Sequence, residues 1–295
     1  MDANKLANKA HLLHLNAISL ATSMKSGSFK SLYRGHGVEF NGVREYFTGD
    51  DVRAIDWNVT ARMGRPYVKM FDEERELDVF IILDVSLSMN SSSGKKSRLM
   101  TALEAASLLT IASFRNSSPV GCVIFDGSIK FSCAPLKGQD QMMLLLSNFE
   151  RNEIQNVKQQ VKGSALDNAI LGAQKLLKKR SLVMILSDFR TGGWTEGFGA
   201  LCLKHDVVAV RIVDPMDENL PNVGSAPFCD LESGITQVLP TNSVKFKDEW
   251  RNANFNRMES WKHECLRRGG IPLVLSTSLD PLVELTRFFA SREQL

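Results

Sequence analysis

The sequence predicts an α/β protein built on a doubly wound, mostly parallel sheet. Two apolar runs rich in β-branched residues, 77–83 and 181–186, have the length and composition of strands that are buried on both faces. Segments with apolar side chains at helical spacing alternate with such runs, as in folds whose sheet is covered by helices on both sides. The runs 120–125 and 129–133 flank Asp126-Gly127, a dipeptide that favours a tight hairpin. We therefore expect one antiparallel strand at the edge of the sheet.

The expected elements follow one another without an internal repeat. An extension, residues 1–76, precedes the α/β domain, residues 77–295. In chain order we expect a helix near 5–24, short strands and loops over 35–75, a strand at 77–83, a helix at 97–115, strands at 120–125 and 129–133, a helix at 139–149, a helix from 164 to 179, a strand at 181–186, a helix at 198–204, strands at 207–213 and 235–239, a helix at 244–268, a strand at 272–276 and a helix at 280–291.

Composition and charge exclude several classes of protein. The 295 residues carry a net charge of only +3, with basic and acidic residues interleaved, so no basic stripe indicates nucleic-acid binding. Five cysteines, without a Cys-x-x-Cys pair, are typical of reduced thiols and predict a cytoplasmic protein. The apolar run 12–24 is interrupted by polar residues, so we expect neither a signal sequence nor a transmembrane segment.

Polar side chains follow the first buried strand at a regular spacing. Asp84, Ser86 and Ser88 come at its carboxyl end, and Asp188 follows the strand at 181–186. Ser164 stands at the start of a predicted helix, where a helix cap is the alternative role. If the two strands are neighbours, these oxygens converge where ligands bind in α/β sheets. Such a set predicts a site for Mg²⁺, or Mn²⁺, with a coordination position open to a carboxylate from a partner protein.

A second group of candidates mixes arginines, acids and one tryptophan within the extension. Closely spaced opposite charges beside aromatic residues favour a structural ion-pair network, and a partner-binding surface is the other interpretation. The paired acids at positions 50 and 51 also suit acid/base chemistry, which their spacing does not require. The group consists of Arg44, Asp50, Asp51, Arg53, Asp56, Trp57 and Arg62.

The common catalytic motifs are missing from the sequence. A phosphotransferase that uses Asp84 as its nucleophile would need a second acid at the position of Ser86. No phosphate-binding loop, dinucleotide-binding glycine motif or Gly-x-Ser-x-Gly elbow is present. We therefore expect an interaction module that is not an enzyme. A metal-dependent hydrolase, or a scaffold that uses the arginine-rich group beside a vestigial metal site, are the alternatives.

These motifs resemble two known families. Asp84-Val85-Ser86-Leu87-Ser88 with Ser164 and Asp188 resembles the metal-ion-dependent adhesion site of von Willebrand factor A domains, although Ser164 stands where that family usually has threonine. The preceding block resembles the bacterial domain of unknown function 58 family, through Gly37-Val38-Glu39-Phe40, Arg44-Glu45-Tyr46, Gly49-Asp50-Asp51-Val52-Arg53, Ile55-Asp56-Trp57 and Thr60-Ala61-Arg62. The resemblance implies a von Willebrand factor A-like domain after a family-specific extension. It also implies an adaptor or partner of a MoxR-type AAA+ ATPase that acts on client proteins.

Overall fold

The structure is a computed structural model that describes residues 37–74, 77–94, 96–155, 166–229 and 236–291. The helix expected near residues 5–24 and the helix start expected at Ser164 lie outside the described residues. Contacts between backbone positions divide the described chain into two compact units, residues 37–74 and residues 77–291.

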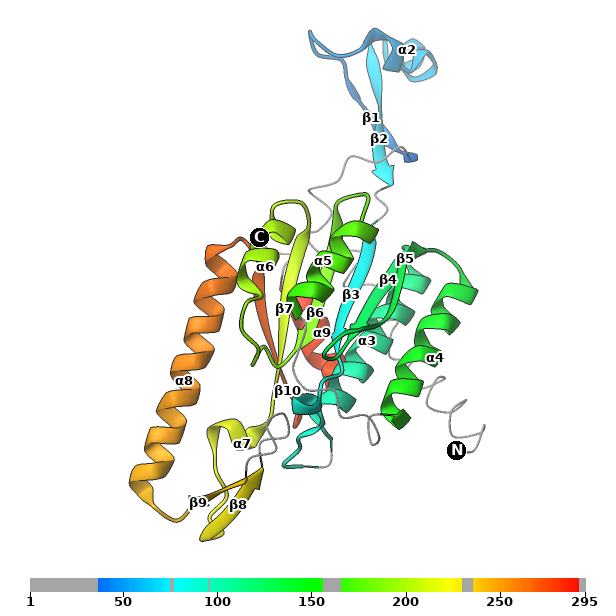
Figure 1. The fold of residues 1–295 in the computed structure, drawn as a ribbon. Coiled ribbons are helices and arrows are strands. Elements are labelled where there is room, and N and C mark those ends of the chain that lie inside the picture. Colours follow the sequence, from blue (N-terminus) through cyan, green and yellow to red (C-terminus); the bar gives the residue numbers. More distant parts are fainter. Residues whose placement is uncertain (1–36, 75–76, 95, 156–165, 230–235, 292–295) are drawn as a thin grey trace. The chain divides into compact units, whose positions relative to one another are not determined.

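The larger unit contains a six-stranded sheet (Figure 1). Its strands, in spatial order, are β10 (Ile271–Ser276), β7 (Asp206–Val213), β6 (Ser181–Ser187), β3 (Asp78–Asp84), β4 (Val120–Phe125) and β5 (Ile129–Leu136). All neighbours are parallel except β4 and β5, which form the antiparallel hairpin. The expected doubly wound sheet with one antiparallel edge strand is therefore confirmed.

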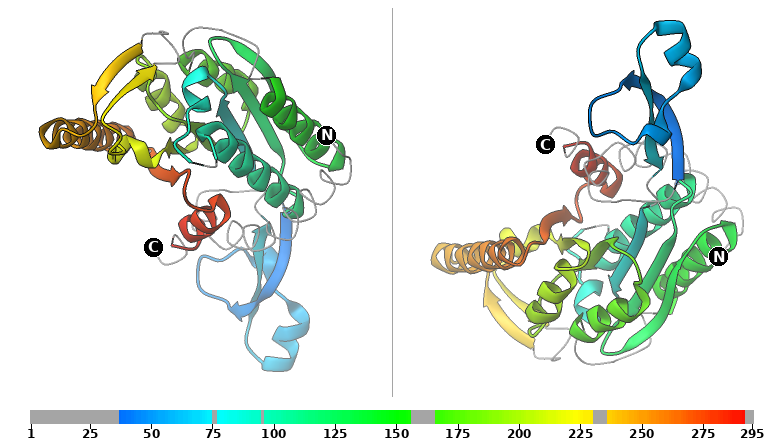
Figure 2. Two further views of the ribbon diagram at one scale, coloured as in Figure 1. Left: turned by 90° about the horizontal axis from the view of Figure 1, so that it is seen from below. Right: turned by 90° about the horizontal axis from the view of Figure 1, so that it is seen from above.

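Helices cover both faces of this sheet (Figure 2). Those of the larger unit are η3 (Leu87–Asn90, a 3-10 helix), α3 (Arg98–Arg115), α4 (Gln139–Gln155), α5 (Leu166–Leu176), α6 (Thr195–Cys202), α7 (Pro215–Glu218), α8 (Val244–Arg267) and α9 (Pro281–Ala290). None of the helices in the described part of the chain is both long and apolar enough to cross a membrane.

The alternation of side chains along β3 creates two hydrophobic cores. Ile81 and Leu83 point into the core formed with α3, α4 and α9. Phe80 and Ile82 point into the opposite core, formed with α5, α6 and the end of α8 near Trp261. Because successive residues of a strand face opposite sides, a wholly apolar strand is what a sheet covered on both faces requires.

The chain changes direction across the sheet between β3 and β6. From β3 it passes through α3 to β4 and β5 on one side, and then returns through α5 to β6 on the other side of β3. At such a switch point the loops after the two strands diverge and leave space at the carboxyl edge. The candidate residues Asp84 and Asp188 lie at this edge.

A small hairpin lies beyond α7. The expected strand at 235–239 is found as β9 (Thr236–Pro240), which pairs antiparallel with β8 (Ser225–Cys229). The sequence did not predict β8, because Pro227 lies at its centre and proline is confined to strands that leave one edge unpaired. The two-stranded sheet β8–β9 offers such an edge.

The smaller unit is a β-hairpin with helical turns inserted at its tip. Strands β1 (Gly37–Glu45) and β2 (Tyr67–Glu74) pair antiparallel, and η2 (Val52–Ala54) and α2 (Trp57–Met63) lie between them. Asp56 caps the start of α2 by accepting from the N–H groups of Asn58 and Val59. Gly64 ends the helix in the left-handed region, at φ 69°, where glycine is favoured.

A buried histidine lies at the amino edge of the large sheet. The Ser181 N–H donates to Nδ1 of His205 at 3.3 Å, which requires that Nδ1 carry no proton. Burial lowers the pKa of His205 below its ordinary value of 6.5, with help from the cations Lys204 and Arg180 and against the attraction of Asp206.

We expect this histidine to make stability depend on pH. Since the pKa of His205 is lower in the folded state, the unfolded chain binds more protons at mildly acidic pH. The contribution of His205 is therefore fully present above about pH 6.5 and is lost as the pH falls through the folded-state pKa. Urea unfolding at several pH values measures the slope of the free energy of unfolding against pH. His205→Asn, which keeps an acceptor, should flatten it, whereas the same change at the exposed His263 should not.

Candidate metal-ion site

The first part of the site is the turn that follows β3. The chain leaves the buried strand at Asp84, and the N–H of Ser86 donates to Asp84 Oδ1 at 2.9 Å. The hydroxyl oxygens of Ser86 and Ser88 lie 3.1 Å apart. Because Ser86 and Ser88 are two residues apart, their hydroxyls lie on the same side of the turn as the carboxylate of Asp84, the last residue of β3.

The second part comes from the neighbouring strand β6. Leu83 pairs with Leu186, so the residues that end the two strands are adjacent. The Ser187 hydroxyl donates to Asp84 Oδ2 at 2.6 Å, across 103 positions of the sequence. Asp188 follows directly and is also buried. The convergence of Asp84 and Asp188, expected if the strands were neighbours, thus has its structural basis in the pairing of β3 with β6.

The two buried carboxylates repel each other. The pKa of Asp84 is raised to about 7: burial is the largest cause, the charge of Asp188 adds to it, and the hydrogen bonds from Ser187 and Ser86 oppose the change. Asp188 Oδ2 is buried and accepts no hydrogen bond from the described residues; Nε of Arg190 approaches it only to 3.6 Å. The site therefore brings two buried carboxylates close together, and Arg190 pairs with one of them.

This donor set fits a hard divalent cation. Carboxylate and hydroxyl oxygens are the ligands of Mg²⁺ and Mn²⁺, whereas zinc sites are built mainly from histidine and cysteine. Among the described residues no group of three or more His, Cys, Asp or Glu could hold a metal ion, so an ion bound here would also need the serine hydroxyls as ligands. Ser164 lies outside the described residues, and its part in the site is not defined.

Arg98 connects the turn after β3 to α7 through hydrogen bonds. Its guanidinium, only 3% exposed as a residue, donates two hydrogen bonds to Asp217 at 2.7 and 2.8 Å. It also donates to the Ser88 carbonyl oxygen at 3.4 Å and to the Ser91 hydroxyl. A bidentate pair of arginine and carboxylate is among the stronger polar contacts in proteins, so it fixes the orientation of both elements.

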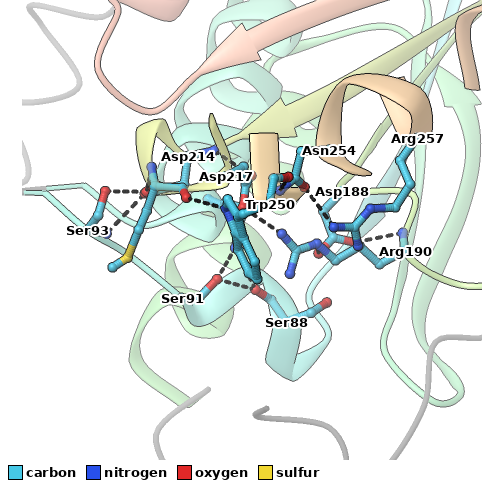
Figure 3. A network of polar contacts seen from close by, with 12 residues as sticks. Ser88, Ser91, Ser93, Asp188, Arg190, Asp214, Asp217, Trp250, Asn254 and Arg257 are labelled. Atoms are coloured by element: carbon cyan, nitrogen blue, oxygen red, sulfur yellow. Dashed lines mark hydrogen bonds and ion pairs between the residues drawn. The ribbon is translucent and has the colours of Figure 1, made fainter. Parts of the chain in front are cut away.

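Arg190 connects the same carboxylate to the turn after β6. Its Nη2 donates to Asp217 Oδ1 at 2.6 Å, while its backbone N–H donates to Asp188 Oδ1 at 3.2 Å (Figure 3). Asp217 is thus shared by Arg98, the first residue of α3, and Arg190, in the turn after β6. The turns that carry Ser88 and Asp188 are thereby held in a fixed relation.

A second acid of α7 stabilises the adjoining loop. Asp214 accepts from the Ser93 N–H at 3.0 Å, from the Ser93 hydroxyl and from Thr277 Oγ1 at 3.2 Å. Burial raises the pKa of Asp214, but these hydrogen bonds and the charge of Arg98 outweigh it and leave the pKa below its ordinary value. Asp214 also caps α7, so it fixes the helix that presents Asp217.

Several residues of this network escaped the sequence analysis, among them Ser187, Arg98, Arg190, Asp214 and Asp217. Asp214-Pro215 carried a local signal, since an acid before proline is typical of a helix start. Ser187 directly precedes a predicted ligand. Arg98 and Asp217 gave no signal, because 119 positions separate them and neither belongs to a local motif.

The arginine-rich group of the smaller unit separates into two kinds of residue. Arg44 forms a bidentate pair with Asp50, which lowers the pKa of Asp50 to about 2, and the N–H of Phe47 adds to this effect. Asp51 and Asp56 cap η2 and α2. The remaining members, Arg53, Trp57 and Arg62, are exposed. In the described part of the chain, Arg53 and Arg62 form no ion pair with these acids.

Proteins of known sequence include relatives that match the whole chain. It is 28% identical to the uncharacterized protein Mb1516 of Mycobacterium bovis and, equally, to the uncharacterized protein Rv1480 of Mycobacterium tuberculosis. Each alignment covers 100% of this chain and 92% of the relative.

Solved structures also match the larger part of the chain. A conserved hypothetical protein, BatB from Bacteroides thetaiotaomicron, matches with a TM-score of 0.50 and 19% identity over 74% of this chain and 100% of the other. The VWA domain of SpRpn10 matches with a TM-score of 0.35 and 9% identity over 72% of this chain and 95% of the other. At its identity, the likeness to BatB concerns the fold alone, and the mostly parallel sheet with one antiparallel edge strand is the arrangement that the sequence predicted.

A family model covers most of both units. The model described as "Protein of unknown function DUF58" matches residues 42–260, which include the arginine-rich group, both buried carboxylates and the network around Asp217. The chain therefore belongs to the DUF58 family.

Proposed function

We propose that this chain is a protein-interaction module that holds Mg²⁺, or Mn²⁺, at the carboxyl edge of its sheet and is not itself an enzyme. Asp84, Ser86, Ser88 and Asp188 would hold the ion, with Ser164 as the further ligand that the sequence motif suggests. When bound, the ion supplies positive charge and an open coordination position that a carboxylate of a client protein can fill.

The observation that carries this proposal is the close approach of two buried carboxylates at the switch point. Two buried carboxylates on adjacent strands lie close enough for the charge of one to raise the pKa of the other. Such an arrangement destabilises a protein unless a cation joins it. Asp188 Oδ2, which accepts no hydrogen bond from the described residues, supports the same conclusion.

The surroundings of the site favour binding over reaction. Asp84 accepts hydrogen bonds from Ser86 and Ser187, and Asp188 accepts from the backbone of Arg190, so both carboxylates are held in place. His205, a residue type often used for proton transfer, lies at the amino end of β6, at the opposite edge of the sheet. A rigid set of oxygens suits a partner that is held and released.

The partner we propose is a MoxR-type AAA+ ATPase, for which this chain would recruit or adapt client proteins. This part of the proposal rests on the family resemblance of the sequence. The chain has no phosphate-binding loop of its own, so ATP hydrolysis would belong to the partner. Localisation in the cytoplasm, inferred from the cysteines, is consistent with such a partner.

We expect Mg²⁺ to raise the thermal stability of the protein at pH 8. At a concentration of about 100 times Kd the gain is about 2.7 kcal/mol, or about 5–10 °C in Tm for a domain of this size. Asp84→Asn and Asp188→Asn should each abolish the gain, yet raise Tm in the presence of chelator, because each removes one of two repelling charges. Differential scanning calorimetry measures both effects.

Asp140→Asn is the matched control, because Asp140 is an exposed acid in the first turn of α4. It should keep the full response to Mg²⁺. A response that survives in Asp84→Asn and Asp188→Asn would refute the site. Binding of the purified ATPase that is equal with Mg²⁺ and with chelator would refute the role of the ion while leaving the site intact.

We expect Arg98 to support the site without being a ligand. Arg98→Gln should lower the free energy of unfolding by about 3 kcal/mol, because it breaks a buried pair with Asp217. It should also weaken Mg²⁺ binding, since the turn that carries Ser88 loses its anchor. Urea unfolding and calorimetric titration measure these effects. Arg287→Gln, which breaks an exposed pair with Glu284, should cost less than about 1 kcal/mol and leave Mg²⁺ binding unchanged.

A metal-dependent hydrolase is the second candidate. The raised pKa of Asp84, about 7, is the observation that favours it, because a carboxyl group with such a pKa can act as a general base near neutral pH. Under the leading proposal, the purified chain with Mg²⁺ or Mn²⁺ should hydrolyse p-nitrophenyl phosphate and bis(p-nitrophenyl) phosphate no faster than Asp84→Ala does. Turnover that needs both the metal and Asp84 would establish the hydrolase instead.

A further inference from the structure

The smaller unit, residues 37–74, exposes large apolar side chains between its two strands. The exposed fractions are 65% for Phe47, 60% for Val52, 68% for Trp57 and 60% for Met63. Val68 is the single buried hydrophobic residue among those of the unit whose side chains are described. Scattered apolar residues are normal on protein surfaces, but a hairpin with so small a core gains little stability from its own packing. Burial of these side chains against another surface would supply the missing stability.

The four acids of this unit whose side chains are described are engaged within it. Asp50 pairs with Arg44, and Glu45 pairs with Arg65 at 3.3 Å. Asp51 accepts from the N–H of Arg53, and Asp56 caps α2 and lies 4.0 Å from Lys69. These acids therefore stabilise the turns of the hairpin tip and are poorly available to a partner.

Two arginines are sequence neighbours of the exposed apolar residues. Arg53 follows Val52 in η2, and Arg62 precedes Met63 in α2. Both arginines are exposed, and within the described residues neither forms an ion pair. Their long side chains can reach the carboxylates of a bound segment while the neighbouring apolar side chains pack against its apolar residues.

We propose that Val52, Trp57 and Met63, together with Arg53 and Arg62, form a docking surface for an acidic segment of another protein that carries apolar anchor residues. Tryptophan and arginine are the residues that most often dominate binding energy in protein interfaces. Nucleic acid fits less well, because residues 42–69 contain five cations and four acids, too little excess charge for a phosphate backbone. The surface acts independently of the metal-ion site.

A synthetic peptide tests this surface in the full-length chain. The probe is a fluorescein-labelled peptide in which glutamate alternates with leucine and phenylalanine, and anisotropy is measured with chelator present. We expect it to bind, more weakly as salt increases. The same peptide with lysine for glutamate, or with serine for the apolar residues, should bind at least about tenfold more weakly.

Variants of the surface provide the decisive comparison. Arg53→Gln combined with Arg62→Gln, and separately Trp57→Ala, should each weaken peptide binding about tenfold. The matched controls in the larger unit are Lys178→Gln combined with Lys179→Gln, and Phe255→Ala, where Phe255 is 63% exposed. These controls should bind as the wild type does. Equal binding of the lysine peptide, or equal binding by the surface variants and the wild type, would overturn the proposal.

Other occupants of the surface give different results. Acrylamide quenches the fluorescence of exposed tryptophans, and the part of the quenching that Trp57→Phe lacks reports the accessibility of Trp57. This accessibility should be high in the free chain and should fall when the peptide is added. Low accessibility in the dilute free chain would show that the chain covers its own surface, and a fall with protein concentration alone would show a second copy. Either result would overturn the proposal.

The experiment also separates this proposal from the metal-ion proposal. Asp84→Asn should leave peptide binding unchanged, and Trp57→Ala should leave the Tm gain with Mg²⁺ unchanged. Loss of peptide binding in Asp84→Asn would contradict the independence of the two surfaces.

Discussion

The parallel pairing of β3 with β6 is the constraint on which the candidate metal-ion site depends. It brings the ends of two strands together so that Ser187 bonds Asp84 and Asp188 lies nearby. The pairing cannot shift by one residue, because Phe80 and Ile82 would then exchange hydrophobic cores with Ile81 and Leu83. The apolar packing of the sheet therefore also determines the geometry of the polar site.

The burial of two neighbouring carboxylates lowers the stability of the fold. Two carboxylates are buried at the switch point, and the arginines nearby are engaged with Asp217. Arg98 pairs with Asp217, whereas Arg190 pairs with both Asp217 and Asp188. Such local strain is typical of sites where proteins give up stability for function. The well-packed cores on both faces of β3 compensate for it.

The sequence was most informative where the signal was local. Apolar runs predicted the strands of the large sheet, and Asp126-Gly127 predicted its edge hairpin. Asp84, Ser86 and Ser88 were predicted as candidates because their spacing lies within one turn, and the structure places the hydroxyls of Ser86 and Ser88 3.1 Å apart. Long-range partners could not be identified in this way, as Arg98 and Asp217 illustrate. Similarly, the sequence grouped Arg44, Arg53 and Arg62 by composition, and only three-dimensional contacts distinguish the arginine that pairs with Asp50 from the two that do not.

The 103 positions that separate Asp84 from Ser187 have a consequence for biosynthesis. A contact this distant in sequence can close only after the intervening chain has been synthesised, and its closure costs more conformational entropy than that of a local contact. During synthesis, the turn after β3 leaves the ribosome long before β6 does. Until β6 joins the sheet, Asp84 lacks both Ser187 and its repelling neighbour. A nascent chain therefore cannot assemble the complete site, and capacity to bind there would mark molecules that have finished folding.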